Sequence, residues 1–244
     1  MISEEEKKRA INLIKVRLGT GNILILSLTG SRAFGWGSKI YDIDIRGIYE
    51  KENYWSYCHL GLPPFDINLS EMMGLFYSVK SRSWTIFEDL SKPFLVHPLF
   101  DFKKFMSLCS SGNVRYHLGT IEFQRIRAER WRDIRTILHA YRLLVVPLYF
   151  LETNTLEINV DLLNRIYLNS EILDSLIKEY KEGRNRRVND KEWALINGEL
   201  NNLWSVLKET LDSTKDQFSM EDFKEWVLEL TSSFGRELPR WLRL

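Results

Sequence analysis

The sequence predicts an α/β protein, in which a small mixed-sheet domain of the α+β type is followed by an all-helical domain. Three apolar or alternating runs before residue 70 have the pattern of β-strands. From residue 99 onward, apolar residues recur at helical spacing nearly to the end of the chain. We therefore expect two domains, a sheet domain over residues 1–98 and a helical domain over 99–244.

Composition limits the function classes. The 244 residues suffice for two modest domains, and a hydrophobic fraction of 44% can fill a core. The net charge of +1 gives no general attraction to nucleic acid, so any binding patch must be local. Two cysteines argue against a disulfide scaffold. The charged first ten residues are no signal peptide, and the longest apolar run, 143–151, contains Pro147 and is too short to span a membrane. We expect a cytoplasmic protein without a membrane partner.

Cap signals and periodicity define the elements of the first domain. Ser3 and Glu6 form a capping-box pattern at the start of a helix over 3–18. Three strands are predicted at 23–29, 42–49 and 65–69. Residues 51–64 are expected to form a loop. Ser70 is expected to cap a helix that reaches about residue 80, and a short helix should follow over 83–90.

Helical periodicity accounts for the rest of the chain. Five helices are expected, over about 99–109, 113–152, 160–181, 189–212 and 219–232. Pro147 should kink or end the second helix, because proline lacks the N–H that a helix interior requires.

A glycine–serine turn follows the first predicted strand, where the apolar run ends at Thr29. Gly30 and Ser31 would expose backbone N–H groups, which suit a phosphate. The Ser31 hydroxyl adds a donor, and Arg32 could add a charged one. An ordinary tight turn is the alternative for Gly30.

The second predicted strand begins ten residues later with acidic and apolar residues in alternation. Alternate side chains of a strand share a face, so Asp42, Asp44 and Arg46 would project together. Two close carboxylates repel each other and usually need a cation, and their oxygen atoms suit Mg²⁺. The alternative is an exposed strand face on which Arg46 pairs with the aspartates; Arg46 is equally a candidate phosphate contact.

Asp66, on the third predicted strand, would supply another carboxylate, although Glu71 and Asp89 compete for this place. Three carboxylates beside a phosphate cradle predict two-metal phosphoryl chemistry. One ion would hold the triphosphate and the other would lower the pKa of an attacking hydroxyl, with Asp66 as a bridging ligand or base.

These motifs resemble a known signature. Gly30-Ser31, a ten-residue gap and the sequence DID at 42–44 are similar to the DNA polymerase β-type nucleotidyltransferase superfamily, and FDI at 65–67 resembles its third acidic strand. Within the superfamily, GSRAFG…DIDIRGIY most resembles the nucleotidyltransferases associated with RNA ligases and RNA repair. The resemblance covers about residues 23–90. It implies transfer of a nucleoside monophosphate from an NTP, expected to be ATP, with two Mg²⁺ ions and an RNA acceptor or RNA ligase as partner.

The resemblance also implies residue roles. Asp42, Asp44 and Asp66 would be the catalytic metal ligands, and Gly30 and Ser31 would grip phosphate. In the helical domain, residues 137–144 resemble a His-Arg helix of that family. This helix adds two nucleotide-binding candidates, His139 and Arg142, although a packing histidine is the alternative for His139. Many relatives carry Pro-Asp-Ser before the first metal aspartate, whereas this chain has KIY at 39–41, a departure that bears on substrate choice.

Seven arginines crowd the middle of the helical domain: Arg115, Arg125, Arg127, Arg130, Arg132, Arg135 and Arg142. They are interpreted either as a solvated helix face with local ion pairs or as a basic wall that holds a nucleic acid backbone or the triphosphate. Nearby aromatic residues, Tyr116, Phe123 and Trp131, would correspondingly pack in the core or stack on bases.

Two alternatives to RNA-directed transfer stay open from the sequence. One is transfer of AMP to a protein, as small relatives in toxin–antitoxin pairs do. The other is a non-catalytic nucleotide or RNA sensor on the same fold, suggested by the bulky Trp36 and Tyr41 around the turn. Three carboxylates together argue against a pure binding role, because a binder has little use for them.

Overall fold

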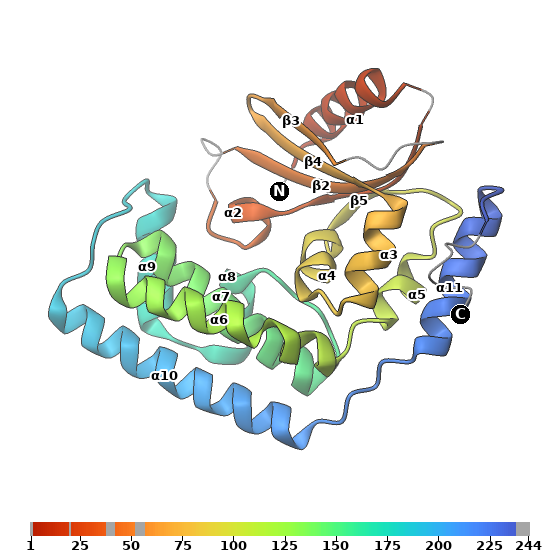
Figure 1. Ribbon diagram of the computed structural model, residues 1–244. Helices are drawn as coiled ribbons and strands as arrows, with labels where there is room; N and C mark the ends of the chain where they lie inside the picture. The colour runs from red at the N-terminus through yellow and green to blue at the C-terminus, as the bar shows by residue number, and fades with distance from the viewer. Residues whose placement is uncertain (1, 20, 38–41, 52–56, 238–244) are drawn as a thin grey trace. The chain divides into compact units, whose positions relative to one another are not determined.

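The computed structural model describes residues 2–19, 21–37, 42–51 and 57–237. It confirms an α/β fold, with a five-stranded mixed sheet and a helical C-terminal region (Figure 1). The chain forms two compact units. The sheet unit comprises residues 1–30, 42–110 and 217–244, and the helical unit comprises 31–41 and 111–216. The sheet unit thus also includes the last helix, beyond the predicted boundary at residue 98.

The sheet has the strand order β3-β4-β2-β1-β5. Strands β2 and β4 run parallel, and the other neighbouring pairs run antiparallel. The strands are β1 (Asn22–Leu28), β2 (Ile43–Glu50), β3 (Cys58–Leu62), β4 (Phe65–Glu71) and β5 (Pro93–Val96). The parallel pair at the centre therefore places corresponding positions of β2 and β4 beside each other on one face.

Two of these strands correct the sequence analysis. β3 lies inside the stretch expected to be a loop, and β5 lies between the helices expected over 83–90 and 99–109, where no strand was predicted. Both are short, and each is stabilised by a ladder of hydrogen bonds to a neighbouring strand, β3 to β4 and β5 to β1. Local sequence patterns do not contain such pairing information.

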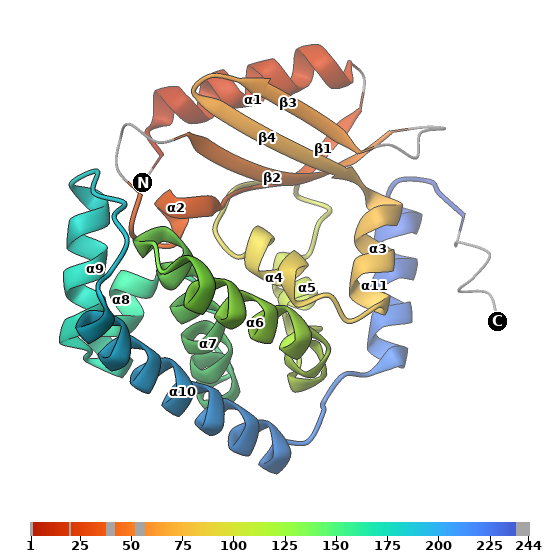
Figure 2. The same ribbon diagram turned by 60° about the vertical axis from the view of Figure 1, so that its left-hand side comes forward.

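Helices cover both faces of the sheet. α1 (Glu4–Leu18) lies along one face, and α3 (Met72–Lys80) and α4 (Trp84–Leu90) lie against the other (Figures 1 and 2). The predicted capping box of α1 is present, with Ser3 and Glu6 bonded reciprocally. The predicted cap of α3 is wrong. Glu71 rather than Ser70 is the N-cap, and its carboxylate accepts the Met73 N–H at 2.7 Å.

The last helix joins this unit through aromatic packing. α11 (Met220–Ser233) carries the buried Trp226, whose ring meets that of Phe76 on α3 edge-on at 5.6 Å. Trp226 also meets Phe105, on the short helix α5 (Phe102–Ser107), at 5.7 Å. These contacts link a segment at the end of the chain to one near its middle, which explains why the unit is discontinuous in sequence.

The helical unit is built around α7 (Ile134–Thr153), most of whose side chains are buried. Around it pack α6 (Ser111–Trp131), α8 (Val160–Leu163), α9 (Glu171–Lys181) and α10 (Asp190–Ser213), and a π-helical turn, η1 (Asn164–Leu168), follows α8. Among the described residues, α7 is the one helix long and apolar enough to cross a membrane, but 72% of the relevant window is buried inside the protein. α7 is therefore a core helix.

Two long predicted helices are broken in ways the periodicity did not reveal. The helix expected over 113–152 divides at Arg132, which has a φ of 54°, and α7 then continues through Pro147. The break is stabilised by the loop before α10, because Val188 donates to the Arg132 carbonyl at 2.9 Å. The helix expected over 160–181 becomes π-helical at Asn164 and is interrupted at Asn169, which has a φ of 54°; the Asn164 side-chain amide bonds the backbone of Ser170 across the interruption.

Candidate functional site

Two of the three predicted acidic residues lie side by side on the parallel strands of the sheet unit. Asp44 on β2 pairs in register with Asp66 on β4. Paired residues of neighbouring parallel strands project from the same face, and the strands lie about 4.8 Å apart. Both side chains are half-buried, whereas their neighbours Ile43 and Ile45 are buried behind them. The alternation that the sequence predicted is therefore present.

Gly30 lies directly against Asp44. It has a φ of 67°, and a Cβ built on it would lie 2.5 Å from Cγ of Asp44 and 2.8 Å from its Cβ. The backbone next to Gly30 also contacts this strand end, because the Thr29 N–H donates to the Asp44 carbonyl at 2.9 Å. Glycine is thus required for two reasons, the left-handed backbone and the close approach of the carboxylate.

Asp66 is surrounded by polar groups that the sequence analysis did not assign to the site. His59 on β3 contributes Nε2 at 2.7 Å from Oδ1 of Asp66, and Asn68 donates to the same oxygen at 3.3 Å. Tyr57 in turn donates its hydroxyl to Asn68. An ionised carboxylate only accepts, so His59 donates from Nε2. The signal that would have identified His59 is the pairing of β3 with β4, which places His59 opposite Asn68.

The remaining candidates of the sheet unit are less engaged. Asp42 is exposed and precedes the first residue of β2, and Arg46 is half-buried with a 3.3 Å bond to the Ile45 carbonyl. Of the competing acids, Glu71 caps α3 and Asp89 accepts from the Thr29 hydroxyl at 3.2 Å. Both competitors thus have structural roles, which leaves Asp66 as the carboxylate beside Asp44.

The donor set suits a magnesium ion only in company with other oxygens. Within the described part of the chain, no group of three or more His, Cys, Asp or Glu side chains is close enough together to hold a metal ion. Mg²⁺ is commonly bound through one or two carboxylates, with substrate phosphates and waters completing its octahedron. The in-register carboxylates of Asp44 and Asp66 fit that mode, in which the bound nucleotide contributes part of the coordination.

Gly30 begins the short helix α2 (Gly30–Ala33), and the loop formed by α2 and residues 34–37 is tightly folded. The Ser31 carbonyl accepts the N–H groups of both Trp36 and Gly37, at 3.1 and 2.7 Å. Gly35 has a φ of 91°, and a Cβ on it would lie 2.9 Å from Cγ of Asn159. The loop conformation therefore requires its glycine spacing. Arg32 in this loop is half-buried, whereas residues 39–41, including Tyr41, lie outside the described residues.

His139 and Arg142 both contact aromatic residues of this loop. The His139 ring stands edge-on to Trp36 at 5.5 Å and to Phe34 at 6.2 Å, and the Arg142 guanidinium lies 4.4 Å from the Phe34 ring centre. Burial and, to a smaller extent, the charges of Arg142 and neighbouring arginines lower the pKa of His139 from 6.5 to about 3. His139 is thus a neutral imidazole at physiological pH, able to hydrogen-bond but not to act as a cation.

The predicted residues are distributed between the two units. Gly30, Asp42, Asp44, Arg46 and Asp66 belong to the sheet unit, and Ser31, Arg32, His139 and Arg142 belong to the helical unit. No protein-family model matches the chain, and neither does any curated protein. Within the sheet unit, the arrangement offers two aligned carboxylates beside a glycine turn. Within the helical unit, it offers an arginine and a neutral histidine packed on an aromatic loop.

Proposed function

We propose that this chain is a magnesium-dependent nucleotidyltransferase that moves a nucleoside monophosphate from an NTP to an acceptor hydroxyl, with RNA as the acceptor. The observation that carries the proposal is the in-register pair of Asp44 and Asp66 on parallel strands, with Gly30 against Asp44. The resemblance of GSRAFG…DIDIRGIY to nucleotidyltransferases associated with RNA repair supports the same reaction.

In this reaction the acceptor oxygen forms a new bond to the α-phosphorus of the NTP. The bond between that phosphorus and the bridging oxygen of the β-phosphate breaks, and pyrophosphate leaves with the electron pair. The acceptor hydroxyl loses its proton, and we assign Asp66 as the base that takes it. Because His59 and Asn68 donate to Oδ1 of Asp66, they hold this carboxylate in a fixed orientation.

Asp44 and Asp66, with the exposed Asp42 before them, are the residues that would hold Mg²⁺. When bound, the metal would neutralise phosphate charge and lower the pKa of the acceptor hydroxyl. Gly30 lets the turn approach the carboxylates closely, since no side chain occupies the space between its Cα and Asp44. A side chain at residue 30 would therefore displace the Asp44 carboxylate from its position.

The test is transfer of label from each of the four NTPs, α-labelled, to total RNA and to total protein in the presence of magnesium. Pyrophosphate release is measured in parallel. We expect labelled RNA, and we expect Asp44→Asn and Asp66→Asn to lower the rate by at least about 100-fold. The matched control is Asp212→Asn, since Asp212 is an exposed acid on α10.

Three outcomes would each contradict one part of the proposal: the acceptor, the catalysis or the role of the carboxylates. If protein is labelled and RNA is not, the acceptor is a protein rather than RNA. Tight NTP binding without pyrophosphate release would make the chain a sensor. Equal rates of transfer by the wild type and both aspartate variants would mean that Asp44 and Asp66 take no part in catalysis.

A further inference from the structure

A cavity of about 540 Å³ lies at the start of α7 in the helical unit. Its walls come from α6, the first turns of α7 and the loop between α9 and α10. Binding sites for small molecules usually have volumes of about 300–1,000 Å³, so the space is large enough for a nucleotide. The lining residues are Gln124, Arg127, Trp131, Asp133, Arg135, Thr136, His139 and Asn185.

The charge of this cavity is positive. Arg127 and Arg135 contribute two guanidinium groups, whereas Asp133 is the one acid among the lining residues. Both oxygens of Asp133 are already engaged in capping α7, because they accept the Thr136 N–H at 3.0 Å and the Thr136 hydroxyl at 2.6 Å. The positive end of the α7 dipole adds to the field. An anion with several acceptor oxygens, such as a phosphate, suits two guanidinium forks.

The cavity also has an aromatic wall. Trp131 is 47% exposed, and the Arg127 guanidinium lies 4.3 Å from its ring centre. Phe123, one turn before Arg127 on α6 and outside the cavity lining, is 60% exposed and lies 5.9 Å from the same guanidinium. Exposed aromatic rings interleaved with arginine are a typical surface for stacking nucleic acid bases.

Two amides hold these walls together. Gln124 donates from Nε2 to the Thr136 carbonyl at 3.2 Å and accepts from Arg127 at 3.4 Å. Asn185 accepts the Arg135 N–H at 2.9 Å. Because both amides are bonded to the first turn of α7, the wall positions are fixed before any ligand arrives, which reduces the entropy lost on binding.

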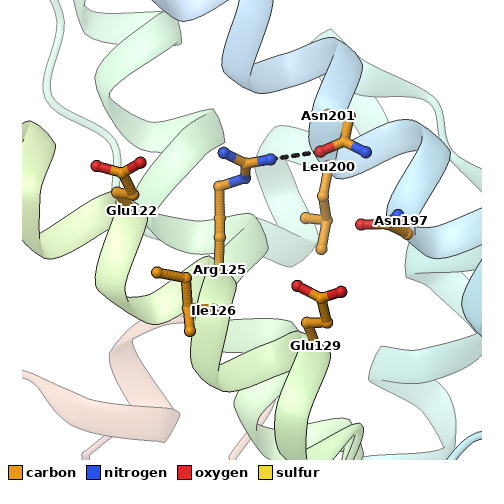
Figure 3. A pocket seen from close by; sticks show the side chains of 7 residues that line it. All are labelled: Glu122, Arg125, Ile126, Glu129, Asn197, Leu200 and Asn201. Atoms are coloured by element: carbon orange, nitrogen blue, oxygen red, sulfur yellow. Dashed lines mark hydrogen bonds between the residues drawn. The ribbon is translucent and has the colours of Figure 1, made fainter.

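A second cavity, of about 250 Å³, lies between α6 and α10 and has a different character. Figure 3 shows Arg125 reaching toward Asn201, with Glu122 and Glu129 nearby. The guanidinium also lies 5.0 Å from the ring centre of Trp204. Two carboxylates and a partnered arginine leave no excess positive charge, so this cavity is interpreted as a structural joint between the helices.

We propose that the cavity lined by Arg127, Trp131 and Arg135 binds a nucleoside monophosphate group, with the phosphate on the two arginines and the base on Trp131. The group is either a free nucleotide or the 5′-phosphorylated end of an RNA, which present the same chemistry. This inference does not depend on Asp44 or Asp66, because every lining residue belongs to the helical unit.

The test is isothermal titration calorimetry of the full chain with AMP, adenosine and inorganic phosphate. The titrations use an Asp44→Asn/Asp66→Asn background in EDTA, so that the proposed catalytic site contributes no metal-dependent binding. We expect AMP to bind more tightly than adenosine or phosphate alone. Arg127→Gln and Arg135→Gln should each weaken AMP binding about tenfold and leave adenosine binding unchanged. Trp131→Ala should weaken AMP and adenosine alike, and Trp131→Phe should restore most of the loss.

The matched control is Arg130→Gln, because Arg130 is an exposed arginine of α6 outside the cavity lining. Thermal melts and circular dichroism check that each variant folds. If Arg127→Gln does not fold, Arg135→Gln still tests the proposal, because Arg135 is exposed and its replacement disturbs little packing. Unchanged AMP affinity in folded Arg127→Gln and Arg135→Gln would overturn the proposal, as would equal affinity for AMP and adenosine. Comparison of matched 5′-phosphorylated and 5′-hydroxyl RNAs then distinguishes the sources. If the phosphorylated RNA binds more tightly than AMP, the ligand is an RNA end. If the phosphorylated RNA and AMP bind equally, the ligand is a free nucleotide.

This experiment separates the two proposals of function. If the wild type transfers no label from any NTP but the titrated protein binds AMP, the catalytic assignment is contradicted and the cavity proposal is supported. If the wild type transfers label but the titrated protein does not bind AMP, the catalytic assignment is supported and the cavity proposal is contradicted.

Discussion

The Asp44 carboxylate packs directly on the backbone of Gly30, so the turn after β1 and the acidic end of β2 form one structural element. A Cβ on Gly30 would lie 2.5 Å from Asp44 Cγ, far inside van der Waals contact. The same turn is bonded to β2 through the Thr29 N–H and the Asp44 carbonyl. Two motifs that are ten residues apart in the chain are therefore coupled sterically.

The first prediction follows from this contact. Gly30→Ala should destabilise the sheet unit and displace Asp44, because the new methyl group cannot fit beside the carboxylate. The control is Gly19→Ala, since Gly19 has nearly the same φ, 68°, but no atom within 4 Å of the added Cβ. Both variants bear a backbone cost of about 1 kcal/mol, and Gly30→Ala should lose at least about 1 kcal/mol more in urea unfolding. Equal losses would contradict the packing argument.

The second prediction concerns Glu71. Burial raises its pKa from 4.5 to about 7, against the opposing effects of the Met73 N–H and Arg236. The folded state therefore holds a proton that the unfolded state releases, and the stability that this proton provides is lost as the pH rises from 4.5 through 7. Glu71→Gln, which resembles the protonated acid, should be more stable than the wild type at pH 8 by up to about 3 kcal/mol.

The measurement for Glu71 is urea unfolding of both proteins at pH 5 and pH 8. Their difference in free energy of unfolding should be small at the lower pH and large at the higher one. If the two curves shift in parallel between these pH values, the Glu71 carboxyl is not the responsible group.

A third prediction rests on the neutral His139. Its pKa of about 3 lies below the ordinary 6.5, owing first to burial and then to Arg142, Arg135 and Arg127, with Asp133 acting in the opposite direction. The unfolded state therefore takes up a proton that the folded state resists. Stability is fully present above pH 6.5 and falls toward pH 3, with a contribution of up to about 1.4 kcal/mol per pH unit.

His139→Asn should flatten this dependence, because the amide does not titrate. The slope of the free energy of unfolding against pH between 4.5 and 6.5 is compared in the two proteins, and the slope rather than the absolute stability is decisive. An identical slope in the variant would mean that His139 is protonated as easily in the folded chain as in the unfolded one.

The fourth prediction concerns His59 and depends on the proposed transferase activity. His59 donates to Oδ1 of Asp66 at 2.7 Å, so His59→Ala should lower kcat about tenfold through a less ordered Asp66, with KM for the NTP little changed. His59→Gln should recover part of kcat, because its amide can also donate. A change confined to KM would instead place His59 in substrate binding.

Much of the fold could be predicted because short-range sequence patterns, such as helix caps and apolar periodicity, specify its elements. α1 has its capping box at Ser3 and Glu6, and β2 alternates apolar and acidic residues as expected. α10 and α11 begin and end close to the predicted positions, since each starts at a side-chain cap and has a regular apolar stripe. These signals act between residues within a few positions of each other.

The features that the sequence analysis missed share a cause in hydrogen bonds between segments. β3 and β5 exist through ladders to β4 and β1. The break at Arg132 is stabilised by the loop before α10, and the interruption at Asn169 by hydrogen bonds between Asn164 and Ser170. In each case the conformation depends on hydrogen bonds to another segment, which the periodicity of apolar residues does not encode.

The sequence alone determined the α/β class, the acidic alternation of Asp42 and Asp44 and the glycine turn before it, because chain neighbours set strand alternation and backbone freedom. Only the tertiary structure decided that Asp66 stands in register with Asp44, that His59 supports it, and that Arg127, Trp131 and Arg135 line one cavity. These relationships depend on strand register and helix packing, which result from the summed burial of many side chains rather than from any local motif.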